Sequence, residues 1–412
     1  MNLSIDRERL TQELEALGQI SAAPAPVVTR VVFTEADLRA RGFVKRLCRE
    51  AGLIVREDPV GNTFARWVGE DEGLAPVGTG SHIDAIPNAG RYDGTVGVQG
   101  GLEAIRALIR SGFRPRRSIE LLIFTSEEPT RFGIGCLGSR LLAGLLDASS
   151  DELLKDHDGK SLGEVRAAAG YVGPLSAVRL PSGYYSGFIE LHIEQGPLLE
   201  RRQVPIGVVT AIAAPASLKI WIEGEGGHAG AVLMPDRRDA FLAAAEIALA
   251  VESIVRSTGA EDTVGTVGVC EVSPGAVNSI PSRVRIEVDI RDIDQARRDS
   301  VLDKLAAAGQ EIASRRRVTV RTELVNADPP AQCAPSVVDT LIAACETHSL
   351  RFDRMISRAY HDSLFISRIA PVAMVFIPCR GGVSHRPDEY ASPDAIADGT
   401  LILAEALARL AE

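Results

Sequence analysis

The sequence predicts an α/β fold: a helix-covered, mainly parallel sheet, interrupted by an inserted α+β domain of the ferredoxin-like type. Apolar strand patterns alternate with helical patterns in the first half of the chain, as in parallel sheets covered by helices. Residues 210–326 instead show the order β-α-β-β-α-β of a ferredoxin-like unit. Polar residues that could share one site follow predicted strands on both sides of this insertion. The first domain is therefore expected to be discontinuous, with residues 1–209 and 327–412.

The elements of the discontinuous domain follow from short apolar runs and longer helical patterns. We expect helices at Glu35–Ala51, Val96–Arg110, Ser336–Thr347 and Pro393–Leu410. We expect strands at Ala75–Gly80, Ser118–Phe124, Phe188–Leu191 and Val372–Ile377.

The inserted domain has its own regular pattern. Strands are expected at Leu218–Glu223, Thr263–Val272, Arg283–Ile290 and Val318–Leu324, and helices at Asp236–Val255 and Ile293–Ser314. Strict alternation of apolar residues along Arg283–Ile290 places one face of that strand on a core. Asp328-Pro329-Pro330 marks the return to the first domain.

Composition restricts the class of protein. A chain of 412 residues with 45% hydrophobic and 24% charged residues is typical of soluble globular proteins. The net charge of −10 argues against a nucleic-acid partner, because non-specific binding needs clustered cations. No apolar run is long enough to cross a bilayer, and residues 1–20 lack the apolar core of a signal peptide. The six scattered cysteines form no C-x-x-C pair, so we expect reduced thiols, a cytoplasmic location and no membrane partner.

Candidate metal ligands lie at or just beyond the ends of the predicted strands. They are His82, Asp93, Glu127, Glu128, His192 and His385. The carboxyl ends of parallel strands share one edge of a sheet, and ligands bind at that edge. Convergence of histidines and carboxylates there is what a two-metal hydrolytic site requires.

Each candidate alone also has a simpler interpretation. His82 and Asp84 fit either a histidine satisfied in a turn or a ligand whose ring tautomer is set by the Asp84 carboxylate. Asp93 precedes a glycine, as turn residues do, or bridges two metals roughly 3.5–4 Å apart. Glu127-Glu128 fits a solvated helix N-terminus, or a pair in which one carboxylate binds metal and the other acts as a base. The joint pattern favours the functional interpretation.

The ligand types indicate an open, catalytic metal centre. Histidine and carboxylate ligands of this number leave coordination positions open, whereas structural zinc sites are closed and usually rich in cysteine. Nitrogen and oxygen ligands suit two divalent ions, Mn or Zn, with Co or Ni as further candidates.

Six motifs, in this order, resemble the hydantoinase/carbamoylase amidase family, which belongs to the dinuclear metallopeptidase-like amidohydrolases. They are GSHIDAIPNAGRYDG at 80–94, TSEEPTRFGIGCLGSR at 125–140, LHIEQGP at 191–197, GGHAG at 226–230, MPDRRDA at 234–240 and GVSHRPDE at 382–389. The resemblance runs over essentially the whole chain. Family members include ureidoglycolate and allantoate amidohydrolases and N-carbamoyl-L-amino-acid hydrolases.

The resemblance implies a role for each matched residue. One metal would be held by His82, Asp93 and His192, and the other by Asp93, Glu128 and His385. Glu127 would be the general base. The inserted domain would serve as a lid and as the interface of a homodimer, with His228 reaching the partner subunit's site to polarise the scissile carbonyl.

The resemblance also implies a substrate pocket lined by Gln195, Asn278, Arg291 and His361. Arg291 ends the alternating strand on its polar side, so it could present a planar fork to a carboxylate; the alternative is an ordinary surface charge.

One departure from the family pattern bears on the substrate. Residues 357–363 read SRAYHDS where many relatives carry SGAGHDA, so Tyr360 replaces a glycine and should narrow the pocket. Together with FIPCRGGVSHRPDEY at 376–390, this is more similar to ureidoglycolate amidohydrolases.

The implied activity is hydrolysis of the ureido C–N bond of a small carboxylate, with ureidoglycolate giving glyoxylate, ammonia and carbon dioxide. Four alternatives stay open: an allantoate amidohydrolase, an N-carbamoyl-L-amino-acid hydrolase, an aminoacylase or dipeptidase, and a non-catalytic metal-dependent binding protein.

Overall fold

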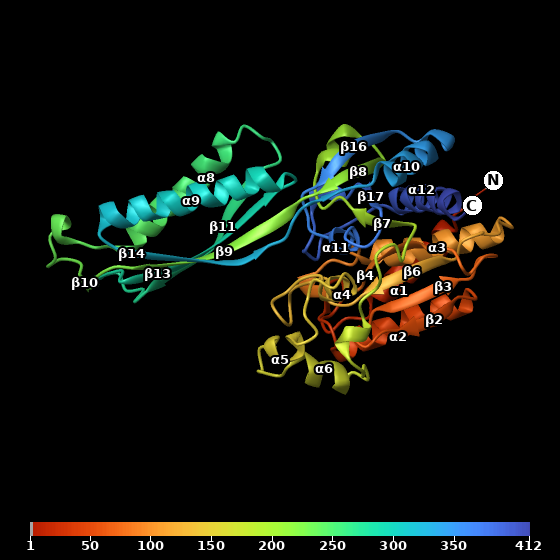
Figure 1. Cartoon of the computed structure of the whole chain (residues 1–412), viewed down its shortest axis with the longest axis horizontal. Helices are drawn as coiled ribbons and strands as arrows, with labels where there is room; N and C mark the ends of the chain where they lie inside the picture. The colour runs from red at the N-terminus through yellow and green to blue at the C-terminus, as the bar shows by residue number, and fades with distance from the viewer. Residues whose placement is uncertain (1–2) are drawn as a thin grey trace. The chain divides into compact units, whose positions relative to one another are not determined.

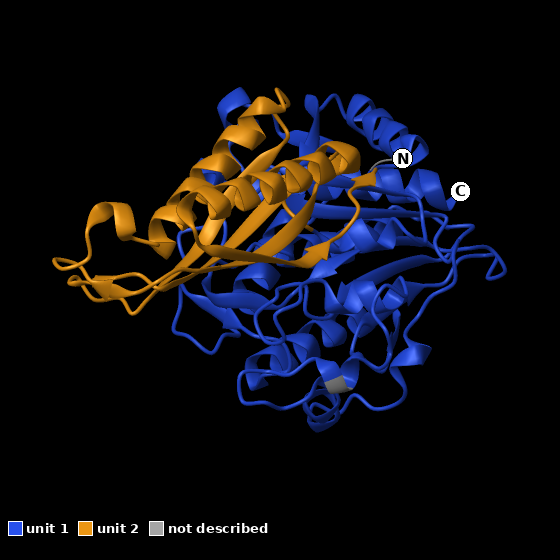
Figure 2. Ribbon diagram, turned by 60° about the vertical axis from the view of Figure 1, so that its left-hand side comes forward, with its two compact units in different colours: residues 1–210, 333–357, 361–412 blue, residues 211–332, 358–360 orange. Residues whose placement is uncertain are grey.

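The computed structural model describes residues 3–412 (for residue 152 the backbone only) and divides into two compact units (Figure 2). Unit 1 comprises the chain up to Thr210 together with Cys333–Ser357 and His361–Glu412. Unit 2 comprises Ala211–Gln332 and Arg358–Tyr360. Unit 2 extends past residue 326 because the short strand β15 (Ala331–Gln332) pairs with Ala211 and Ile212.

A large mixed sheet forms the centre of unit 1 (Figure 1). Its strands there are β2 (Ile54–Glu57), β3 (Thr63–Trp67), β4 (Val77–His82), β6 (Ile119–Phe124), β7 (Gly187–Ile193), β8 (Ile206–Ile212), β16 (Phe352–Ser357) and β17 (Val372–Ile377). The central strands β17, β7, β4 and β6 are neighbours in that order and run parallel. Antiparallel strands extend the sheet on both sides, with β8 on β17, and β3 and then β2 on β6. The predicted α/β fold is confirmed, and its parallel part is the centre of the sheet.

Helices cover both faces of this sheet. They are α1 (Arg7–Gly18), α2 (Glu35–Glu50), α3 (Thr95–Arg110), α4 (Leu137–Leu142), α5 (Ser150–Leu153), α6 (Leu162–Ala168), α7 (Leu198–Arg202), α10 (Pro335–Thr347), α11 (Asp362–Ile366) and α12 (Pro393–Ala411). On β7, Leu191 packs so closely on α3 and α12 that a Cβ at Gly100 would lie 2.7 Å from its Cδ2. The adjacent Glu190 instead bonds Ser363 at the start of α11. Because neighbouring strand residues point to opposite faces, these helices lie on opposite sides.

Unit 2 has the predicted ferredoxin-like arrangement. Its main elements are β9 (Ala214–Glu223), α8 (Ala240–Ser257), β11 (Val264–Ser273), β13 (Arg283–Asp292), α9 (Gln295–Arg316) and β14 (Thr319–Ala327). The sheet order is β11-β13-β9-β14, with every pair antiparallel, and α8 and α9 cover one face (Figure 1). The alternating residues Val284, Ile286, Val288 and Ile290 are buried in the core beneath these helices. A separate pair, β10 (Gly227–His228) with β12 (Ser279–Ile280), belongs to the same unit.

None of the helices within residues 3–412 combines the length and apolar character that a membrane span needs.

Candidate metal centre

The strand ends and loops of unit 1 bring four of the predicted ligands together around a fifth, Asp93. His82 is the last residue of β4, and His192 lies near the end of the adjacent parallel strand β7. Their Nε2 atoms lie 3.7 and 3.1 Å from Oδ1 of Asp93. Oδ2 of Asp93 lies 3.0 Å from Nε2 of His385, which is 3.4 Å from Oε1 of Glu128. The two oxygens of Asp93 thus face two separate ligand groups, as a bridging carboxylate requires.

The histidine tautomers suit metal binding. Nδ1 of His82 lies 3.0 Å from the backbone oxygen of Asp84, and Nδ1 of His192 lies 2.9 Å from that of Ile193. A carbonyl oxygen only accepts, so each Nδ1 carries a hydrogen. When each ring is neutral, as in a metal-bound state, its Nε2 lone pair is therefore directed at the cluster, which is the usual arrangement for a metal-binding histidine.

Asp84 acts differently from the expectation based on the sequence. Its Oδ1 lies 3.8 Å from Nδ1 of His82, beyond hydrogen-bond distance, so the tautomer of His82 is set by the backbone oxygen instead. The buried carboxylate accepts hydrogen bonds from the backbone N–H groups of Glu127 (3.2 Å, to Oδ1) and Glu128 (3.1 Å, to Oδ2). Asp84 therefore orients the two glutamates rather than the ring.

The turn after β6 directs the adjacent glutamates to different places. It begins with Ser126 in the left-handed region, at φ 56°, a conformation that non-glycine residues adopt only where the surroundings hold it. Glu128 faces His385, whereas Oε2 of Glu127 lies 3.8 Å from Nε2 of His82. The thiol of Cys136 lies 3.4 Å from Oε1 of Glu127 and donates to it. One carboxylate thus joins a ligand group while the other stands beside it.

Burial and close mutual contacts shift the pKa values of the carboxylates and histidines of this centre. Burial opposes ionisation of Asp93, but hydrogen bonds from His192, His385 and His82 hold its pKa well below the usual range. Burial, together with the charge of Asp93, raises the pKa of Glu128 to about 7. The hydrogen bond to Asp93 raises the pKa of His385 to about 9. Protons on these histidines occupy the place that divalent cations would take, so the donor set fits two metal ions.

Two of the predicted pocket residues also lie at this centre. Gln195, in the left-handed region at φ 55°, donates from Nε2 to Oδ2 of Asp93 (3.0 Å) and to Oγ of Ser384 (3.1 Å). The ring of His361 lies 4.6 Å from that of His192 in an edge-to-face arrangement.

The other three predicted residues belong to unit 2. His228 and Asn278 are neighbours, since the N–H of Ala229 bonds to the backbone oxygen of Asn278. Nδ1 of His228 accepts from the N–H of Gly230 at 3.1 Å, so the neutral ring carries its hydrogen on Nε2 and can donate there. Arg291, at the end of β13, is paired with Asp289 through Nε at 2.8 Å. The remaining nitrogens of its guanidinium make longer contacts, of 3.3 Å or more.

Sequence reasoning missed several residues that support the centre. Glu190 accepts from Ser81 (2.8 Å) and Ser363 (2.6 Å) inside an otherwise apolar strand, and a lone carboxylate in such a run was the signal for it. Glu389 accepts from the backbone of Tyr92 and Asp93. Only its place in the GVSHRPDE motif pointed to it.

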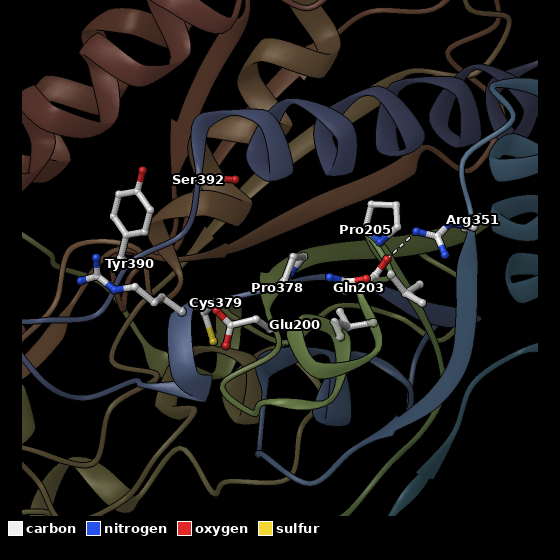
Figure 3. A pocket seen from close by; sticks show the side chains of 11 residues that line it. Glu200, Gln203, Pro205, Arg351, Pro378, Cys379, Tyr390 and Ser392 are labelled. Carbon is white, nitrogen blue, oxygen red and sulfur yellow. Dashed lines mark hydrogen bonds between the residues drawn. The ribbon is translucent and has the colours of Figure 1, made fainter.

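A cavity of about 520 Å³ in unit 1 lies beside the segment that leads to His385 (Figure 3). Its wall includes Cys379, Arg380 and Tyr390, and Figure 3 shows Glu200 between this wall and Gln203. None of the predicted ligands lines it. The carboxylate of Glu200 accepts from the N–H of Gly381 at 2.7 Å and so supports the loop from outside the centre.

Comparison with known proteins agrees with this geometry. The pattern of Peptidase family M20/M25/M40 matches residues 78–409. The chain is 53% identical over 416 residues to a ureidoglycolate hydrolase of Arabidopsis thaliana, spanning 99% of this chain and 87% of that protein. A crystal structure of AtUAH in complex with glyoxylate superposes with a TM-score of 0.89 at 53% identity, covering 99% of this chain and 98% of that chain. An amidase of the hydantoinase/carbamoylase family from Burkholderia multivorans superposes with a TM-score of 0.90 at 35% identity, covering 99% and 98%. The chain therefore belongs to Peptidase family M20/M25/M40 and, as its motifs indicated, to the hydantoinase/carbamoylase amidases within it.

Proposed function

We propose that this protein is a dinuclear metal-dependent amidohydrolase that cleaves the ureido C–N bond of ureidoglycolate. The observation that carries the proposal is the division of Asp93 between two ligand groups, with Glu127 beside them. The substrate assignment is supported by the difference in identity: 53% to the ureidoglycolate hydrolase, against 35% to the hydantoinase/carbamoylase family amidase of Burkholderia multivorans. The alternatives, acting on allantoate or N-carbamoyl-L-amino acids, use the same bond chemistry.

Two divalent ions, Mn or Zn in the first place and Co or Ni as further candidates, would supply the positive charge that acidifies a water and polarises the substrate carbonyl. His82, Asp93 and His192 would hold one ion, and Asp93, Glu128 and His385 the other. The chain's own residues would do the rest. Glu127 takes the proton from the attacking water and returns it to the leaving nitrogen. Burial raises its pKa well above the usual value, which suits a group that must both accept and donate a proton.

The proposed bond change accounts for the products. Water adds to the carbonyl carbon of the ureido group. The bond then breaks between this carbon and the nitrogen that is attached to the glycolate carbon. This releases carbamic acid, which decays to carbon dioxide and ammonia, and a hydroxyglycine, which eliminates ammonia to give glyoxylate. One glyoxylate and two molecules of ammonia therefore form from each substrate.

Residues of unit 2 would complete the site. His228, with its hydrogen on Nε2, is suited to donate to the carbonyl oxygen as negative charge develops there. Arg291 would bind the carboxylate with Nη1 and Nη2, whose present contacts are longer than that of Nε with Asp289. Asn278, Gln195 and His361 would line the pocket. We propose that His228 acts in the partner subunit's site of a homodimer formed through unit 2, and that unit 2 serves as a lid. A cytoplasmic location belongs to the same proposal.

A substrate screen tests the assignment. The metal-loaded protein should release ammonia and glyoxylate from ureidoglycolate in a 2:1 ratio, and turn over allantoate and N-carbamoyl amino acids more slowly. The Glu127→Gln variant should bind metal normally yet lose about 10²–10⁴-fold in kcat, because it lacks the base. Equal turnover of all the ureido compounds would reject the substrate assignment, and an active Glu127→Gln enzyme would reject the base.

A further inference from the structure

The two loops that carry Asp93 and His385 have no regular secondary structure of their own. Asp93 lies between β5 (Ala85–Ala89) and α3, and His385 lies between the 3-10 turn Arg380–Gly382 and α12. His385 also has a left-handed backbone, at φ 59°, which persists only where neighbouring contacts impose it. By contrast, His82 and His192 lie on two strands that pair with each other in the sheet. The group containing His385 therefore depends on support from outside regular structure.

One buried side chain joins these loops. Oε1 of Glu389 accepts hydrogen bonds from the backbone N–H groups of Tyr92 (2.8 Å) and Asp93 (3.1 Å). Oε2 lies 2.9 Å from the hydroxyl of Ser384, the residue before His385. That hydroxyl also lies 3.3 Å from Oδ2 of Asp93. Glu389 itself is only 4% exposed, so water does not compete for these contacts.

The backbone around Asp93 is shaped to admit this carboxylate. A Cβ at Gly90 would lie 2.4 Å from Cβ and 2.5 Å from Oε1 of Glu389, distances that real side chains do not adopt. The backbone conformation of Gly90 does not itself call for glycine, since its φ lies outside the left-handed region. The rings of Tyr92 and Tyr390 meet edge to face at 5.9 Å and close the same junction.

We propose that Glu389 is a positioning residue that clamps the Asp93 and His385 loops together and thereby sets the affinity of the ion held by Asp93, Glu128 and His385. The inference rests on the proposed two-metal function. Glu389 touches neither substrate nor metal and acts through the backbone of Asp93 and through Ser384. Because His82 and His192 are held by strands, the other ion depends on the clamp much less.

The charge and the clamp can be separated by substitution. In Glu389→Gln, the amide oxygen can still accept from both backbone N–H groups, and the NH₂ group can donate to Ser384, whose hydroxyl then donates to Asp93. Only the negative charge is lost. Glu389→Ala removes both charge and clamp. Gly90→Ala keeps the Glu389 side chain and its charge, but the added methyl group displaces the carboxylate from its hydrogen-bonding position. Asp388→Asn is a matched control, because it neutralises the adjacent, exposed carboxylate, which pairs with Arg386.

The test is a stepwise Mn²⁺ titration of the chelator-treated protein by calorimetry, with Co²⁺ absorption as a second readout. Glu389→Ala and Gly90→Ala should weaken one binding step by about 10–100-fold, the size usual for residues that orient ligands. That step should be the one abolished in His385→Ala. Glu389→Gln should keep the affinity within a few-fold of the native protein, and Asp388→Asn should match it.

Other outcomes would reject either the clamp or the proposed function. If the native protein binds two ions and Glu389→Ala binds both equally well, or loses both steps equally, the clamp is rejected while the metal centre stands. If the native protein binds no ion, the proposed function itself fails. If Glu389→Ala does not fold, Gly90→Ala decides, because a folded Gly90→Ala with native affinity for both ions also rejects the clamp.

Discussion

Replacing Asp84 by asparagine should damage the metal centre although Asp84 is not a ligand. The carboxylate uses one oxygen for the N–H of Glu127 and the other for the N–H of Glu128. Asparagine has a single acceptor oxygen, so one of these buried N–H groups must face an NH₂ group. Loss of one such bond in a buried site costs about 1–3 kcal/mol, which corresponds to about 5–150-fold in an equilibrium constant.

This cost should appear as weaker metal binding and lower kcat, because the displaced turn carries both glutamates. The assay is a Mn²⁺ titration of chelator-treated protein, followed by kcat at saturating metal. Asp239→Asn is the matched control. Asp239 also accepts two backbone N–H groups, from Phe241 and Leu242, but through the same Oδ1, so asparagine can keep both. Native metal affinity and kcat in Asp84→Asn would refute the role assigned to Asp84.

Three further predictions concern the same centre. Gly94→Ala should lose metal affinity while staying folded, because a Cβ there would lie 2.4 Å from Nε2 of His82. Gly133→Ala is the control, since Gly133 has a similar φ and a Cβ there would meet no atom within 4 Å. Equal metal affinities in the two variants would contradict the steric argument. The Mn²⁺ affinity of the metal-free protein should fall by about tenfold or more per pH unit as the pH drops below about 9, since His385 must lose its proton to bind. His82 adds to this slope, because, against the effect of its burial, the charge of Glu127 raises its pKa well above the usual value. The fall should be steeper below about 7, where Glu128 also holds a proton; a flat profile by calorimetry between pH 7 and 9 would argue against His385 as a ligand. Arg291→Ala should raise KM for ureidoglycolate by about 10–100-fold, as expected for loss of a charged hydrogen bond. It should leave turnover of a neutral ureido compound unchanged. Equal losses for both substrates would show that Arg291 does not bind the carboxylate.

The central parallel strands could be predicted from the sequence because they are buried on both faces of the sheet. Residues 372–377 and 119–124 are continuous apolar or fully buried runs, and such runs mark parallel strands covered by helices. The outer strand Ile54–Glu57 was not predicted. It is a short, exposed edge of mixed polarity, so its pairing leaves no periodic signal.

The candidate ligands were also predictable as a set, because strand ends bring distant residues to one edge of the sheet. Their division into two groups was not predictable from the residues alone. It depends on the rotamer of Asp93, whose two oxygens face different histidines. Their roles in binding metal stay predictions until the titrations above are made.

The amino-acid sequence by itself determined the α/β architecture, the ferredoxin-like insertion and the family, since periodic apolar patterns and contiguous motifs are local properties of the chain. Tertiary structure alone decided that Asp84 orients two glutamates rather than a ring, and that Glu389 joins loops 297 residues apart in sequence. Such contacts depend on loop backbones and side-chain rotamers imposed by packing, and sequence periodicity carries no record of them.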